Sequence, residues 1–180
     1  MVFGAAGCGS SNDANKSDAK TQAVSGSITG SGSSALLPLV KDAAEKYKAE
    51  HKDVSISLNA GGSGTGLKQV SDGSVDMGNS DVPADTKLSK DQADKLEDHK
   101  VCVMTVATIA NKDVAGQVKS LTRQQLTDIF TGKITNWKEV GGPDEKVVLV
   151  TRPKTSGTRA LFKQYALNGA EEASNQSLET

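Results

Sequence analysis

The sequence predicts an α/β protein whose strands form parallel or mixed sheets. Runs with the two-residue period of strands alternate along the chain with runs whose apolar residues recur every three or four positions. Three loops rich in Gly, Ser and Thr, at 27–35, 59–66 and 152–158, each follow a strand-like run and open onto a helix-like run. This order is typical of βα units.

The first predicted elements are a strand, a helix and a strand. Residues 24–29 and 54–58 have strand character, the second with strict alternation. A helix is predicted at 35–51, and Ser33 or Ser34 can cap its N-terminus. One face of this helix collects its apolar residues: Leu36, Leu39, Val40, Ala43, Ala44 and Tyr47.

The middle of the chain continues the alternation. A helix is expected from about Gly66, followed by a short apolar run at 75–78. Ser89 is placed to cap a polar helix that ends near Asp98. Residues 101–110 are almost continuously apolar, which predicts a longer strand buried on both faces.

After Asn111 a fresh βα pattern begins. The sequence predicts a helix from Leu121, a strand at 147–150 and a helix at 158–167. The residues that should face inward on the first of these helices are Leu126, Ile129 and Phe130. We therefore expect one lobe at 25–108 and a second, truncated lobe at 109–180.

The N-terminal 24 residues are expected to be a clipped lipoprotein signal followed by a disordered tether. Small residues precede Cys8 in the run Ala5-Ala6-Gly7-Cys8, which resembles the lipobox of bacterial lipoproteins. Residues 9–21 have no apolar period and are small or polar, as in a linker. Diacyl modification of Cys8 would supply two chains, which suffices for stable anchoring.

The second cysteine, Cys102, lies in the apolar run at 101–104 and is predicted to be a buried strand thiol. A disulfide with Cys8 is an open alternative. Neither cysteine has the spacing of a metal ligand, and His51 and His99 are isolated among charged residues. We expect both histidines to face solvent and no metal to be bound.

The charge balance excludes a broad nucleic-acid surface. The 180 residues carry 21 basic and 22 acidic side chains, for a formal net charge of −1. A nucleic-acid surface normally shows a basic excess. Any bound anion must therefore be held by local geometry.

The three loops supply that geometry. Each places hydroxyls and free backbone N–H groups at a helix N-terminus, where the helix dipole also favours negative charge. One such loop could be an ordinary cap. Three of them in one chain predict a pocket for a small oxyanion.

Five segments, taken in order, resemble the phosphate-binding subunit of bacterial phosphate ABC transporters. They are residues 29–34, 61–69, 75–81, 126–137 and 152–159. The resemblance implies a two-lobed periplasmic-binding-protein fold, type II-like and incomplete at the C-terminus. It also implies a non-enzymatic, cofactor-free monomer, lipid-anchored outside the cytoplasm, that delivers inorganic phosphate to the permease subunits of the transporter.

The resemblance carries over a set of phosphate ligands by position. They are Ser34, the backbone N–H of Ala35, Ser63, Asp81, Arg152, Ser156, Gly157 and Thr158, with Thr65 as a possible addition. Arg152 would be the one strong cation, able to bind two oxygens at once. Asp81 would accept the proton of a phosphate O–H and so reject unprotonated anions.

Three other interpretations have some support in the sequence. Residues 30–35 imitate a dinucleotide fingerprint, but the next strand does not end in the acidic residue that the ribose needs. Residues 154–157 imitate the Lys-Thr-Gly box of penicillin-recognising enzymes, but the matching Ser-x-x-Lys, at 17–20, lies in the tether. Another tetrahedral oxyanion (sulfate, molybdate or phosphonate) remains the alternative ligand.

Overall fold

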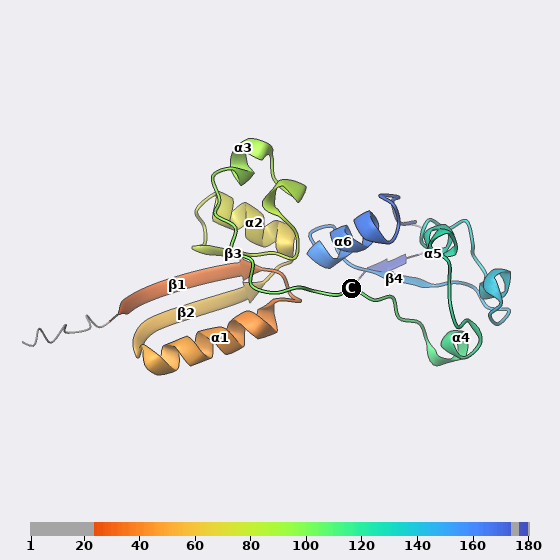
Figure 1. Cartoon of the computed structure of the whole chain (residues 1–180), viewed down its shortest axis with the longest axis horizontal. Coiled ribbons are helices and arrows are strands. Elements are labelled where there is room, and N and C mark those ends of the chain that lie inside the picture. Colours follow the sequence, from red (N-terminus) through yellow and green to blue (C-terminus); the bar gives the residue numbers. More distant parts are fainter. Residues whose placement is uncertain (1–23, 174–176, 180) are drawn as a thin grey trace, which may run out of the picture.

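The computed structural model describes residues 24–173 and 177–179, which form two groups of elements. The first group comprises β1 (Ser25–Gly32), α1 (Leu37–Glu50), β2 (Asp53–Ala60), α2 (Ser63–Ser71), β3 (Met77–Asn79), η1 (Ala84–Thr86) and α3 (Lys90–Ala93). The second comprises α4 (Lys112–Gln117), α5 (Arg123–Phe130), η2 (Trp137–Val140), β4 (Leu149–Thr151), α6 (Gly157–Tyr165) and β5 (Ser177–Glu179). A strand-free and helix-free segment, 97–111, joins them (Figure 1). The predicted boundary at 108/109 lies in that segment, and the division into two lobes there stays a prediction.

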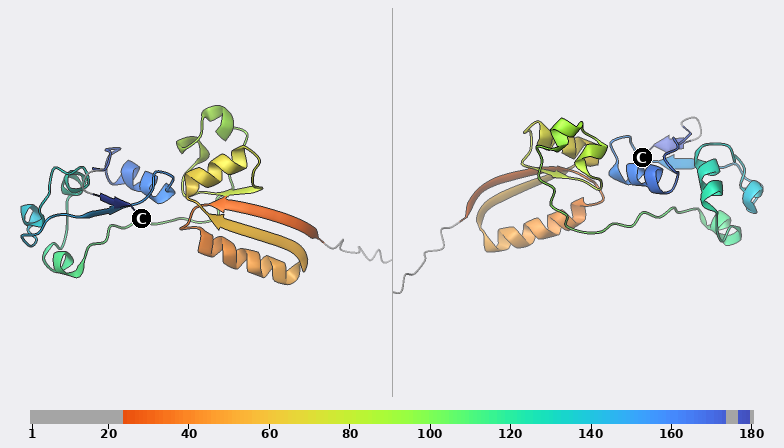
Figure 2. Two further views of the ribbon diagram at one scale, coloured as in Figure 1. Left: turned by 180° about the vertical axis from the view of Figure 1, so that it is seen from behind. Right: turned by 45° about the horizontal axis from the view of Figure 1, so that its top comes forward.

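The first group is built on a parallel sheet of order β2-β1-β3. β1 and β2 pair along their whole length, from Ser25↔Asp53 to Gly32↔Ala60, and β3 pairs with the last three residues of β1. Helix α1 packs on β2, and α2 packs on β1 and β3. The two helices lie on opposite sides of the sheet (Figures 1 and 2). Since the strands are parallel, the loops that follow all three emerge at one edge.

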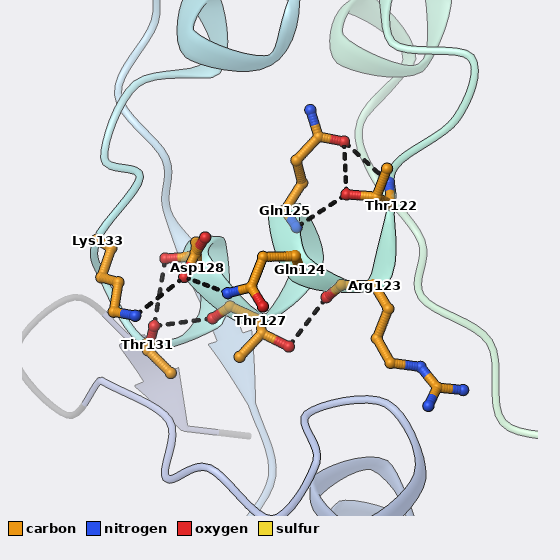
Figure 3. Close-up of polar contacts among 8 residues, drawn as sticks. All are labelled: Thr122, Arg123, Gln124, Gln125, Thr127, Asp128, Thr131 and Lys133. Carbon is orange, nitrogen blue, oxygen red and sulfur yellow. Dashed lines mark hydrogen bonds and ion pairs between the residues drawn. The ribbon is translucent and has the colours of Figure 1, made fainter.

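The second group is organised around α5, whose start is defined by side-chain bonds (Figure 3). The Thr122 hydroxyl accepts a hydrogen bond from the Gln125 N–H at 3.2 Å, and Gln125 Oε1 accepts one from the Thr122 N–H at 2.9 Å. This reciprocal pair satisfies donors that have no partner inside the helix. The helix then buries Ile129, which is 1% exposed. Its core partners are Val147 and Leu149, surrounded by Leu121, Phe130, Ile134, Trp137 and Val140.

The strand predicted at 101–110 is absent, and that prediction was wrong. Val103 is 99% exposed and Ile109 is 92% exposed. Cys102, predicted to be buried, is an exposed free cysteine. The sheets consist of β1–β3 and β4–β5, so this segment has no strand beside it among the described residues. An apolar run becomes a buried strand only when neighbouring strands supply hydrogen bonds and a covering face.

Smaller differences concern the ends of elements and one histidine. The helix predicted from Ser89 to Asp98 is the short α3, although the Ser89 cap is present. Helix α4 and strand β5 were not predicted. His99 is exposed as expected, but His51 is partly buried and stacks on Tyr47 with ring centroids 4.3 Å apart.

Candidate anion site

Three loops converge at the carboxyl edge of the β1–β3 sheet. One contains Ser33, directly after β1, and another contains Asp81, just after β3. Ser63 begins α2 at the same edge. The N-terminus of α6 approaches from the second group and brings Gly157 and Thr158 (Figure 1).

Asp81 is the centre of this convergence. The Ser33 hydroxyl donates to Asp81 Oδ1, and the Thr158 hydroxyl donates to Asp81 Oδ2 at 3.3 Å. The Asp81 backbone N–H donates to Ser63 Oγ at 3.0 Å. Three chain segments far apart in sequence therefore bond through their hydroxyls to one residue, two of them to its carboxylate and one to its backbone N–H. We call Ser33, Ser63, Asp81, Gly157 and Thr158 the Asp81 cluster.

The hydroxyls of the site are removed from solvent. Ser63 is 0% exposed, Ser33 is 1% exposed and Ser156 is 5% exposed. Ser156 caps α6, because its Oγ accepts a hydrogen bond from the Arg159 N–H at 3.2 Å. Buried hydroxyls are almost always hydrogen-bonded, and here Ser33 and Ser63 both bond to Asp81, while Ser156 bonds within its own helix.

Gly157 allows the two helix N-termini to approach each other. A Cβ atom at this position would lie 2.2 Å from Ser63 Oγ and 2.8 Å from Asp81 Oδ2. These distances are far below van der Waals contact, so only glycine permits the observed packing. Gly157 therefore belongs to the Asp81 cluster through its missing side chain.

A second contact lies beside the first. The Gly64 N–H donates to the Thr155 carbonyl at 2.9 Å, and Lys87 Nζ donates to the Lys154 carbonyl at 3.1 Å. These bonds connect the start of α2 and the end of η1 to the loop before α6. The loop 152–158 is thus held against the first group over several residues.

Ser34 and Ala35 lie outside the Asp81 cluster. Both are exposed and lie in the turn between β1 and α1. The buried hydroxyl of that loop belongs to Ser33, which sequence reasoning proposed only as a helix cap. The Ser33 N–H donates to the Asn79 carbonyl at 2.8 Å and so continues the pairing of β1 with β3. Because β1 runs to Gly32 and not to Thr29, the first residue beyond the strand is Ser33.

Arg152 and Thr65 likewise lie outside the Asp81 cluster. The Arg152 side chain is exposed. The Thr65 hydroxyl donates to the Gly61 carbonyl at 2.7 Å, which is a local bond within the first turn of α2. Cys8 lies outside the described residues.

The neighbouring Arg159 is structural. Its Nε lies 2.7 Å from Glu172 Oε2, and its Nη1 donates to the Arg152 carbonyl. Burial raises the pKa of Glu172, and the Arg159 charge opposes that rise. Arg159 therefore connects the start of α6 to the chain that follows it, as expected for a residue that we did not place in the site.

The arrangement suits an anion that carries a proton. The N-termini of α2 and α6 lie close together, since a Cβ atom on Gly157 would be 2.2 Å from Ser63 Oγ, and helix N-termini favour negative charge. Hydroxyls add further donors without adding charge. The Asp81 carboxylate can only accept, so an oxygen beside it must bring its own hydrogen.

Two further features of the described part of the chain bear on the class of site. No group of three or more His, Cys, Asp or Glu side chains there could hold a metal ion. Within the same residues, no helix combines the length and the apolar character needed to cross a bilayer.

Comparison with known proteins agrees with the resemblance found in the sequence. The chain is 51% identical over 173 residues to the phosphate-binding protein PstS of Bacillus subtilis, an alignment that covers 94% of this chain and 57% of the relative. A putative phosphate ABC transporter substrate-binding protein from Clostridium perfringens, solved with bound phosphate, superposes with a TM-score of 0.61 at 30% identity. That alignment covers 86% of this chain and 62% of the solved one.

A second solved structure, an ABC-type phosphate transport receptor from Vibrio cholerae, gives a TM-score of 0.55 at 26% identity over 85% of this chain and 62% of that one. The chain thus spans little more than half the length of these relatives. The profile of the PBP superfamily domain matches residues 17–178. The predicted α/β class with parallel strands is confirmed, as is the resemblance to phosphate-binding proteins. The chain belongs to the PBP superfamily.

Proposed function

We propose that this chain binds inorganic phosphate outside the cytoplasm and delivers it to an ABC transporter. The observation that carries the proposal is the convergence of hydroxyls and helix N-termini on Asp81. The names of the relatives support phosphate as the ligand. Binding without turnover fits this site, because its donors and its single carboxylate can hold an oxyanion but include no activated nucleophile.

The Asp81 cluster suggests how binding occurs. Asp81 accepts the proton of the phosphate O–H, while hydroxyls and N–H groups donate to the remaining oxygens. Ser33 and Thr158 bond to Asp81 itself in the observed arrangement. An incoming anion would take over such bonds after α6 moves away from the sheet. Arg152, Ser34 and the Ala35 N–H remain proposed ligands that would turn toward the anion in that movement.

Attachment to the membrane is part of the same proposal. A diacyl chain on Cys8 would hold the protein beside its permease, and the linker at 9–21 would let it reach the membrane surface. We propose that the protein acts as a monomer in this setting.

The proposal is tested by calorimetric titration of the protein with phosphate, sulfate, molybdate and a phosphonate. We expect saturable 1:1 binding of phosphate and much weaker binding of the others. The variant Thr158→Val keeps the shape of the side chain and removes the hydroxyl, so phosphate affinity should fall about tenfold, equivalent to ~1.4 kcal/mol. Thr65→Val is the matched control and should change affinity little, because its hydroxyl bonds locally. Tighter binding of another oxyanion than of phosphate would favour the alternative ligand.

Selectivity against sulfate tests the role of Asp81. Sulfate carries no proton at neutral pH, so its oxygens would face the carboxylate lone pairs with no hydrogen between them. An unmade hydrogen bond in a buried site costs roughly 1–3 kcal/mol, and more for a charged group. In Asp81→Asn, the amide can donate to sulfate, so sulfate should compete with labelled phosphate at least about tenfold better than in the parent. Equal competition in parent and variant would show that Asp81 is not the selective group.

A further inference from the structure

A basic hollow of about 710 Å³ lies between η1 and α6, next to the candidate anion site. Residues of the first group line one side of it, and the loop before α6, α6 itself and the chain after α6 line the other. The residues that matter here are Thr86, Lys87, Lys154, Arg159, Lys163 and Glu171.

The lining carries more positive than negative charge. Lys163 is paired with Glu171, and Arg159 is paired with Glu172. Lys87 donates to a carbonyl oxygen, which leaves its charge uncompensated, and the Lys154 side chain is exposed. The four cations therefore exceed the two carboxylates by two charges, in a chain whose formal net charge is −1.

Lys87 experiences this positive potential. Its pKa is lowered mainly by burial, and then by the charges of Arg159 and Lys163. The cations of α6 thus act across the gap on a side chain of the first group. The same positive potential attracts any anion that enters the hollow.

The hollow is adjacent to the residues that we place around the anion. Lys154 is two residues before Ser156, whose hydroxyl caps α6. The Lys87 side chain approaches within 3.8 Å of the Cβ position of Gly64, the residue after Ser63. Lys87 and Lys154 therefore flank the contact between α2 and the loop before α6.

We propose that this hollow is the approach path of the anion, where Lys87 and Lys154 raise the local concentration of divalent phosphate and speed its association. The inference rests on the proposed function and deepens it. Neither lysine contacts the Asp81 cluster in any bond described above, so both act on the encounter and not on the bound state. Charges of this kind change the association rate and its dependence on salt more than the dissociation rate.

The test is a rapid-mixing measurement of labelled phosphate binding at several salt concentrations. We expect Lys87→Gln/Lys154→Gln to associate about threefold or more slowly than the parent at low salt, with a flatter salt dependence and an unchanged dissociation rate. Lys154→Gln alone should give a smaller change in the same direction. Because the Lys154 side chain is exposed, this variant should fold like the parent. The control Lys41→Gln removes one exposed charge from α1, as Lys154→Gln does from its loop, and should leave the rates unchanged.

Two outcomes would overturn the inference. Equal association rates in parent and double variant at low salt would show that the hollow does not steer the anion. A change confined to the dissociation rate would show that the lysines are ligands instead. Absence of phosphate binding by the parent would refute the proposed function itself, which is a separate and recognisable result.

Discussion

Strand β1 is rich in Ser and Gly and residues 101–110 are almost continuously apolar, yet of the two only β1 is a strand in the structure. β1 pairs with β2 along its full length and with β3 at its end. The segment 97–111 pairs with no described strand, and Val103 within it is almost fully exposed. The difference lies in the neighbours: β1 has a strand on each side and helices on both faces. A local pattern therefore predicts what a segment can become, and its partners decide what it becomes.

One part of the chain positions the candidate site, whereas the segment 97–111 only joins the two groups of elements. Asp81 and Ser33 are placed by the pairing of β3 with β1, through the bond from the Ser33 N–H to the Asn79 carbonyl. Residues 97–111 make no such contribution. Substitutions in the two regions should accordingly differ in their effect on the free energy of unfolding.

The largest effect is expected for Gly66→Ala in α2. A Cβ atom there would lie 2.4 Å from the Ser31 carbonyl oxygen and 2.5 Å from Gly32 Cα, so the backbone of β1 would have to shift. Overpacking of this kind typically costs up to about 3 kcal/mol, and we expect a loss near that value in urea unfolding. Gly116→Ala in α4 is the matched control, since no atom lies within 4 Å of its Cβ position. That control should be neutral or slightly stabilising.

A smaller effect is expected from removing buried apolar surface. Val54 in β2 is 8% exposed, and Val54→Ala should destabilise the protein by about 2 kcal/mol through lost burial and the remaining cavity. The same change at Val103, which is 99% exposed, should stay within about 0.5 kcal/mol. The pair is compared by denaturant midpoints under identical conditions. A similar loss at both positions would mean that the segment 97–111 is buried in solution and that the comparison fails.

The smallest effect is expected from Asp76, which fastens the chain before β3 to β1. Its Oδ2 accepts hydrogen bonds from the Thr29 N–H at 2.7 Å and the Thr29 hydroxyl at 2.8 Å. These two bonds, the backbone bond first, lower the pKa of Asp76 from its ordinary value of 3.8. A lowered pKa in the folded state contributes stability above the ordinary value, and this contribution is lost as the pH falls through the folded value.

The measurement is the unfolding free energy as a function of pH on the acid side. Asp76→Asn should show a shallower loss of stability below pH 3.8 than the parent. Asp85→Asn, at an exposed position in η1, serves as the control and should follow the parent curve. Identical slopes for Asp76→Asn and the parent would indicate that the bonds to Thr29 do not persist in solution.

Much of the site was predictable because it depends on local chemistry. A Ser, Thr or Gly at the start of a helix has the same donors in any fold, so the loops at 59–66 and 152–158 could be predicted to face an anion. The resemblance then singled out Ser63, Ser156, Gly157 and Thr158 within them. Ser33 was missed as a site residue because it depends on where β1 ends. That end is determined by pairing with β3, whose residues lie more than forty positions further along the chain.

The sequence by itself determined the α/β class, the succession of most elements and the capped helix starts, because these follow from periodicity and from short-range hydrogen bonding. The family came from the resemblance of five segments taken in order. Only the tertiary structure decided which hydroxyls meet at Asp81, that Gly157 must lack a side chain to let α6 approach Ser63, and that residues 101–110 stay unpaired. Each of these depends on a contact between segments distant in the chain. The distance between Gly157 and Ser63 cannot be predicted from a local sequence pattern. It arises only because two helices from distant segments meet at the same edge of the sheet.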